Sequence, residues 1–80
     1  MQFGELLRAE RKKNNISAEV MAGACGVSRS YITLIETGKR LPSAKVIPKI
    51  AEALNLQTNI VLNWYLEGMK VKVEKSLSAD

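Results

Sequence analysis

Apolar residues recur at every third or fourth position along most of the chain. This is the spacing of amphipathic α-helices, in which such positions share one face. The first stretch predicts a helix over residues 2–13, with basic residues in its last turn, where they suit the helix dipole. Asn14 and Asn15 should end this helix, because asparagine adopts left-handed backbone angles more readily than most residues that carry a side chain.

Two short helices are predicted next, over residues 18–25 and 29–36. Ser17 and Ser28 each stand directly before one of them and can cap its free N–H groups. Gly26 interrupts the pattern after only two turns. The two helices should therefore meet at a tight glycine turn.

Residues 37–42 contain glycine, proline and two cations without any periodicity, which predicts an exposed basic loop. Ser43 can cap a fourth helix, and Asn55 should end it. Pro48 lacks the N–H that the interior of a helix needs. We therefore expect a kink or a new helix start near residues 47–48.

A fifth helix is expected with Thr58 as its N-cap, and its continuation beyond residue 67 allows two interpretations. The residues that can extend the helix along one seam are Leu62, Leu66, Met69 and Val73. Val71 and Val73, however, alternate with lysines as in a short strand. The helical extension is favoured, and the chain should fray from Ser76 onwards.

The composition narrows the class of protein. A chain of 80 residues has room for one small core, and 46% apolar with 25% charged residues is a globular balance. No apolar run approaches the length of about 18 residues that a membrane span needs, and the N-terminal segment carries charges where a signal peptide needs an apolar stretch. We therefore expect a cytoplasmic protein that does not interact with membranes.

The chain also lacks the residues of common chemical sites. A single cysteine cannot form an internal disulfide, and the absence of histidine removes the usual zinc ligand and the commonest general base. We expect no metal, no cofactor, no small-molecule ligand and no enzymatic activity. Cys25 itself suits a small buried hydrophobe, with a redox sensor as the alternative.

The positive charge is confined to one part of the sequence. Residues 1–54 hold nine Lys or Arg and five Glu, whereas residues 55–80 hold three basic and three acidic side chains. The net charge of +4 therefore belongs to the first part. A basic surface can bind nucleic acid or simply be solvated, so the position of the cations within a motif has to decide.

The stretch AEVMAGACGVSRSYITLIET, residues 18–37, resembles the helix-turn-helix of the lambda-repressor-like family, also called XRE or Cro/repressor. The resemblance extends over residues 3–66. Ala22 stands where the two helices touch, and Gly26 follows at the turn. The segment ETGKRLP, residues 36–42, is similar to the family's E-x-G-x-x-x-P signature.

This resemblance implies an all-α fold, a compact five-helix DNA-binding domain over residues 1–67. Residues 68–80 would be a helical or short-strand extension that can dimerise and then frays. The implied function is that of a transcriptional regulator, most often a repressor, which binds a palindromic double-stranded DNA operator as a homodimer. The alternative is a protein-interaction module, an antitoxin or adaptor that uses the region of Trp64 and Tyr65.

The resemblance also assigns roles to individual positions. The base-reading candidates, on the second helix of the motif, are Arg29, Ser30, Thr33 and Leu34. The phosphate-binding candidates are Ser17, Ser28, Tyr31, Thr37, Lys39 and Arg40, with backbone N–H groups of the loop beside them. The dimer candidates are Trp64, Leu66, Met69 and Val73.

Several of these assignments have a plainer alternative. Leu34 can meet a thymine methyl or belong to the core, Tyr31 can bind a phosphate or pack half-buried, and Trp64 can be wholly intramolecular. The two loop cations can be merely solvated. Ala18 departs from the family, which commonly has Gln at this position, so one side-chain contact with the DNA backbone is missing. Arg11 and Glu36 occupy positions that pair in relatives, and we expect an ion pair.

Overall fold

The computed structural model describes residues 2–78, and the side chains of residues 2–70. All elements in this part of the chain are helical, which confirms the all-α fold. They are α1 (Phe3–Lys13), α2 (Ala18–Cys25), α3 (Arg29–Glu36), the 3-10 turn η1 (Ala44–Val46), α4 (Ile47–Ala53) and α5 (Thr58–Ser78).

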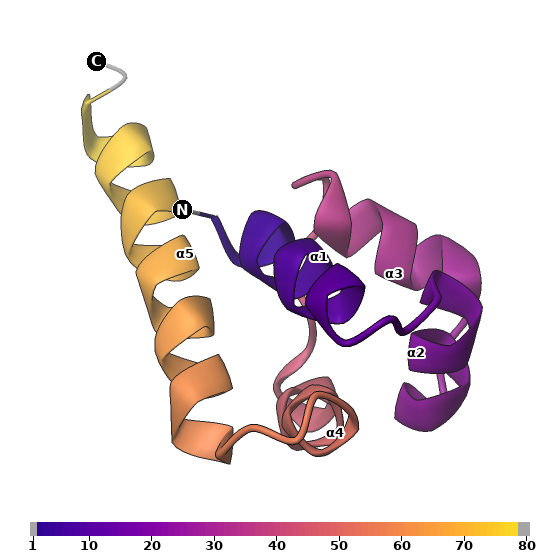
Figure 1. The fold of residues 1–80 in the computed structure, drawn as a ribbon. Coiled ribbons are helices and arrows are strands. Elements are labelled where there is room, and N and C mark those ends of the chain that lie inside the picture. The colour runs from indigo at the N-terminus through magenta and orange to yellow at the C-terminus, as the bar shows by residue number, and fades with distance from the viewer. Residues whose placement is uncertain (1, 79–80) are drawn as a thin grey trace.

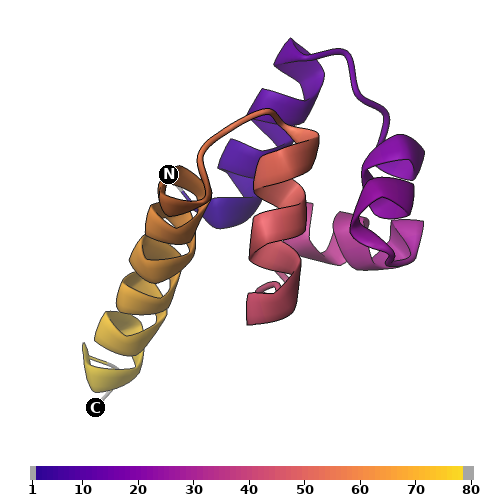
Figure 2. The same cartoon turned by 90° about the horizontal axis from the view of Figure 1, so that it is seen from below.

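The helices surround one core (Figure 1). Helix α1 lies in the middle of the view, with the α2–α3 pair on one side, α5 on the other and α4 below. Seen from below, α4 lies between α5 and the α2–α3 pair, and it packs on both α2 and α5 (Figure 2). The core is formed by Phe3, Leu7, Met21, Ala22, Cys25, Ile32, Ile35, Val46, Ile47, Ile50, Ala51, Leu54 and Val61.

The predicted helix ends are present. Asn15 and Asn55 have left-handed backbone angles, with φ of 57° and 56°, and Gly26 has φ of 68° at the turn between α2 and α3. The hydroxyl of Ser17 accepts a hydrogen bond from the N–H of Val20 at 3.1 Å. The hydroxyl of Ser28 accepts one from the third residue of α3 at the same distance. These local signals place both helices of the motif.

The new helix start expected near Pro48 is confirmed, because α4 begins at Ile47 after the 3-10 turn. The helix caps predicted at Ser43 and Thr58 were wrong. Ser43 makes no side-chain cap. Its carbonyl instead accepts the N–H of Val46, which closes a 3-10 turn through the backbone alone. Thr58 is the first residue inside α5, and the carbonyl of Gln57 before it accepts the N–H of residue 60.

Helix α1 approaches α3 closely at Gly4. A methyl group added there would collide with the carbonyl oxygen of Ile35 and with the backbone of Glu36. Glycine is therefore required at this position by packing, although the backbone angles are helical. The periodicity of apolar residues in α1 gave no sign of this contact.

Helix α5 is 21 residues long and continuous, which confirms the helical interpretation of the tail over the strand. It extends to Ser78, beyond Ser76, where we expected fraying to begin. Its first half packs on the body through Val61 and Trp64, and the rings of Trp64 and Phe3 meet edge to face at 6.1 Å. None of the described helices has the length and apolar character needed to cross a membrane.

Candidate nucleic-acid interface

The first turns of α2 and α3 lie side by side. Arg29, the first residue of α3, reaches across the turn and donates through Nη1 to Oε1 of Glu19 in the first turn of α2, at 3.1 Å. Both side chains are largely exposed, at 67% and 73%. The exposed N-terminal ends of the two helices, with Ser17 and Ser28 as their caps, therefore form one surface.

Helix α3 separates its buried and exposed residues sharply. Ile32 and Ile35 are buried in the core. The opposite face forms an open hollow of about 380 Å³, lined by Arg29, Ser30, Thr33 and Leu34. Because Leu34 is 37% exposed, the alternative that it belongs to the core is wrong. The structure thus brings together all four side chains to which the family resemblance gave a base-reading role.

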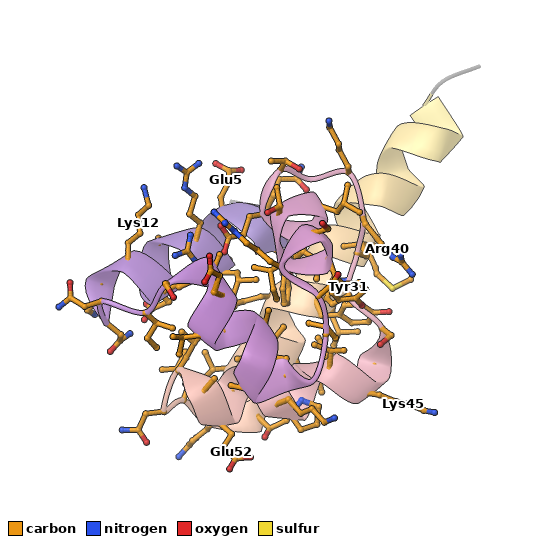
Figure 3. All side chains as sticks on the ribbon, turned by 90° about the vertical axis from the view of Figure 1, so that its right-hand side faces the viewer. Glu5, Lys12, Tyr31, Arg40, Lys45 and Glu52 are labelled. Carbon is orange, nitrogen blue, oxygen red and sulfur yellow. The ribbon has the colours of Figure 1, made fainter. Side chains whose placement is uncertain are left out.

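Tyr31 connects α3 to the loop that follows it. Its phenolic oxygen accepts a hydrogen bond from the backbone N–H of Ser43 at 2.9 Å. The guanidinium of Arg40 lies over its ring, 4.9 Å from the centroid, and Figure 3 shows the two side chains next to one another. Tyr31 is half-buried, so the packing role is confirmed, while its O–H hydrogen still allows donation to a phosphate.

The backbone of residues 37–40 is tied to the end of α3. The N–H groups of Gly38, Lys39 and Arg40 donate to the carbonyls of Ile35 and Leu34 at 2.9–3.2 Å. These N–H groups are therefore already bonded within the protein, and a contact with phosphate through them requires these internal bonds to break or to be shared. The exposed side chains of Lys39 and Arg40 remain as cationic donors.

Thr37 closes the last turn of α3. Its hydroxyl donates to the carbonyl of Thr33 at 2.8 Å, and its N–H donates to the same oxygen at 3.0 Å. A hydroxyl has one hydrogen to donate. Contact with a phosphate through this group therefore requires the internal bond to break.

The ion pair expected between Arg11 and Glu36 is confirmed. Nε and Nη2 of Arg11 donate to the two carboxylate oxygens at 2.8 and 3.0 Å, and Nη1 donates to the carbonyl of Ile16 at 2.8 Å. The side chains are only 12% and 9% exposed. The hydrogen bond to Glu36 raises the pKa of Arg11, and burial of the guanidinium opposes this effect. It fastens α1 to the end of α3, next to the basic loop.

Cys25 lies in the core, as expected of a small hydrophobe. It is 1% exposed, and its Sγ is 3.8 Å from Sδ of Met21. Burial raises the pKa of the Cys25 thiol, against a smaller opposite effect of the nearby Lys49.

The dimer candidates fall into three groups. Leu66 and Met69 are exposed on α5, at 53% and 39%. Trp64 is half-buried against the core with Tyr65, which favours its intramolecular role and leaves less of this region for a foreign protein. The side chain of Val73 lies outside the described residues.

Sequence reasoning missed Glu19 as a member of this surface. An acidic residue in the first turn of a helix is ordinarily explained by the helix dipole. Glu19 and Arg29 are ten positions apart, and only the geometry of the glycine turn brings them together.

Comparisons with known proteins agree with this arrangement. Residues 7–61 match the family model described as helix-turn-helix. Control protein C.BamHI of Bacillus amyloliquefaciens is 40% identical over 67 residues, which are 82% of this chain and 83% of that protein. The ImmF control region 10 kDa protein of Bacillus phage phi105 is 38% identical over 60 residues, 75% of this chain and 67% of the relative. The crystal structure of the restriction-modification controller protein C.AhdI from Aeromonas hydrophila superposes with a TM-score of 0.69 at 36% identity, covering 74% of this chain and 89% of the other.

Proposed function

Because the chain belongs to the lambda-repressor-like helix-turn-helix family of DNA-binding transcriptional regulators, we propose that it binds a palindromic operator as a homodimer and represses transcription there. The observation that carries the proposal is the exposed face of α3. Four side chains able to contact bases gather there, while the opposite face of the same helix is buried. A helix presented in this way fits the major groove.

Arg29 is the principal base reader in this proposal. A guanidinium can donate two parallel hydrogen bonds to O6 and N7 of guanine. Ser30 and Thr33 supply hydroxyls beside it, and the exposed methyl groups of Leu34 suit the methyl group of thymine. Helix α3 therefore combines polar and apolar contacts for distinguishing base pairs.

The surrounding residues are proposed to hold the phosphate backbone. The N-terminus of α2 offers free N–H groups and the capping hydroxyl of Ser17, and the N-terminus of α3 offers Ser28 in the same way. Lys39 and Arg40 supply positive charge from the loop, and Tyr31 can donate its hydroxyl. Such contacts fix the orientation of the protein and carry little sequence information themselves.

The proposed dimer uses the exposed apolar residues of α5. Leu62, Leu66 and Met69 follow the spacing of one helix face and are each 39–53% exposed. A single copy of the motif reads only a few base pairs, whereas two copies with recognition helices about 34 Å apart reach successive major grooves. A second chain packed on α5 would cover this face, and the seam continues towards Val73.

The proposal is tested by selecting bound sequences from a random pool of DNA duplexes and measuring the affinity of the selected site against salt concentration. We expect a two-fold symmetric site occupied by two chains, with affinity that falls steeply as salt rises. Sedimentation with the selected duplex gives the stoichiometry. Failure to enrich any sequence, or an enriched site without symmetry that holds one chain, would refute it.

A paired substitution tests the dimer separately. Leu66→Glu with Met69→Glu places charges on the exposed face of α5 and should weaken operator binding while the helical circular dichroism is retained. Glu67→Gln, an exposed neighbour on the same helix, serves as the control and should bind normally. Unchanged operator affinity in the double-glutamate variant would contradict dimerisation through this face.

A further inference from the structure

We infer that Glu19 is a positioning residue for base reading, which holds the guanidinium of Arg29 in place for a guanine and lowers its tendency to bind phosphates. The inference rests on the proposed function, in which Arg29 reads a base. It adds a residue on α2 to a recognition surface otherwise built on α3.

The geometry leaves the useful part of Arg29 free. The contact with Glu19 engages Nη1. Among the described residues, Nε and Nη2 of Arg29 have no hydrogen-bond partner, and together they form one planar edge of the guanidinium. Two N–H groups on one edge match the two acceptors of guanine in the major groove. Glu19 can therefore fix the rotation of the side chain without competing for the edge that reads the base.

Both ends of the contact are anchored. Glu19 lies in the first turn of α2, which Ser17 caps, and Arg29 is the first residue of α3, which Ser28 caps. Gly26 sets the turn between the two helices. The backbone is thus fixed on both sides of the contact, and the ion pair restricts the rotation of Arg29, a long side chain that otherwise loses considerable rotational freedom when it binds.

Stability does not explain the pair. Ion pairs between side chains as exposed as these contribute little to folding. A carboxylate on a surface that meets DNA instead repels phosphates and neutralises part of the charge of Arg29. Its effect should therefore appear in the ratio of specific to non-specific binding, since it disfavours backbone contacts by Arg29 more than contact with a guanine.

The test is a thermodynamic cycle on DNA. Wild type, Glu19→Gln, Arg29→Ala and the double variant are titrated by fluorescence anisotropy against the selected operator, its single base-pair substitutions and a random duplex. Glu52→Gln is the matched control, since Glu52 is an exposed carboxylate that projects from α4 (Figure 3). Glu19→Asp, one methylene shorter, tests the reach of the carboxylate.

We expect Glu19→Gln to bind the random duplex about 3-fold more tightly, because a negative charge near the phosphates is removed. At the base pair for which Arg29→Ala loses its preference, Glu19→Gln should lower the preference about 5- to 10-fold, which is a part of what a bidentate arginine contributes. The base preference of Glu19→Asp should lie between those of wild type and Glu19→Gln, and Glu52→Gln should keep the full preference of wild type. In the Arg29→Ala background, Glu19→Gln should not change base preference at all.

Other roles of Glu19 give different results. A residue that only supports the N-terminus of α2 would shift thermal unfolding and leave base preference within about 2-fold of wild type, which would overturn the inference. A Glu19 that contacts cytosine directly would change preference even without Arg29, which would also overturn it. If Arg29→Ala keeps the wild-type preference at every base pair, the assignment of α3 as the base reader fails together with this inference. The comparison of wild type with Arg29→Ala alone is sufficient to reveal this outcome.

Discussion

The ion pair of Arg11 and Glu36 should make the effects of the two residues on stability depend on each other. Single and double alanine substitutions measure this coupling. Glu36→Ala removes two charge-assisted hydrogen bonds but leaves Arg11 bonded to the carbonyl of Ile16 at 2.8 Å. Arg11→Ala leaves both the carboxylate and that carbonyl without their donor. The arginine variant should therefore be the less stable of the two.

The magnitudes follow from burial. Breaking a fully buried pair costs about 3–5 kcal/mol, and a pair just beneath the surface, 12% and 9% exposed, should lie at or below the lower end. We expect a loss of about 2 kcal/mol for Glu36→Ala and about 3 kcal/mol for Arg11→Ala. The double variant should lose about 3 kcal/mol, because the second substitution no longer isolates a charge. A domain of this size has about 4–12 kcal/mol to lose, so all the variants should fold.

Urea unfolding followed by circular dichroism gives the free energy of unfolding of each variant. Arg8→Ala, which removes an exposed arginine from the same helix, is the control and should change stability by at most about 0.5 kcal/mol. Losses for Arg11→Ala and Glu36→Ala that simply add in the double variant would refute the reasoning. Equal losses in the two single variants would refute the role of the Ile16 carbonyl.

Three further predictions concern the core and the loop. Gly4→Ala should lower the free energy of unfolding by about 2–3 kcal/mol in thermal unfolding, because the backbone of α3 cannot move away from the added methyl group. Gly23→Ala, which adds a methyl group in open space on a helix, should instead raise the free energy of unfolding by about 0.5–1 kcal/mol. Equal effects of the two substitutions would contradict the packing argument. Cys25 should react with an aromatic disulfide reagent only after urea is added, since burial blocks access and raises the pKa of the thiol; rapid labelling of the native protein would count against it. Tyr31→Phe should lower the free energy of unfolding in urea by about 1 kcal/mol, because the N–H of Ser43 loses its acceptor. An unchanged free energy of unfolding would show that water replaces the phenolic oxygen as the acceptor.

Features set by neighbouring residues could be predicted from the sequence. Ser17, Ser28 and Gly26 act within four positions of themselves, so their types were sufficient to place both helices of the motif. The ion pair of Arg11 and Glu36 was predicted from a family resemblance, because no local rule connects residues 25 positions apart.

Features that depend on tertiary contact could not be predicted in this way. The N–H of Ser43 binds a tyrosine twelve positions earlier, and nothing in its immediate sequence indicates this partner. The requirement for glycine at position 4 arises from the backbone of α3, which lies far away along the chain. Glu19 meets Arg29 only because the angle between two helices brings their first turns together.

The bonds that tie the basic loop to α3 also affect the entropy of binding. With the backbone of residues 38–40 bonded to the helix end and Ser43 bonded to Tyr31, the loop needs no reordering when it meets another molecule. Only its long side chains then lose freedom, at about 0.5–1.5 kcal/mol for each one immobilised. Arg40, already stacked on the ring of Tyr31, should lose less than Lys39. Helix α3 and the loop that follows it are thus held together as one preorganised unit before any partner binds.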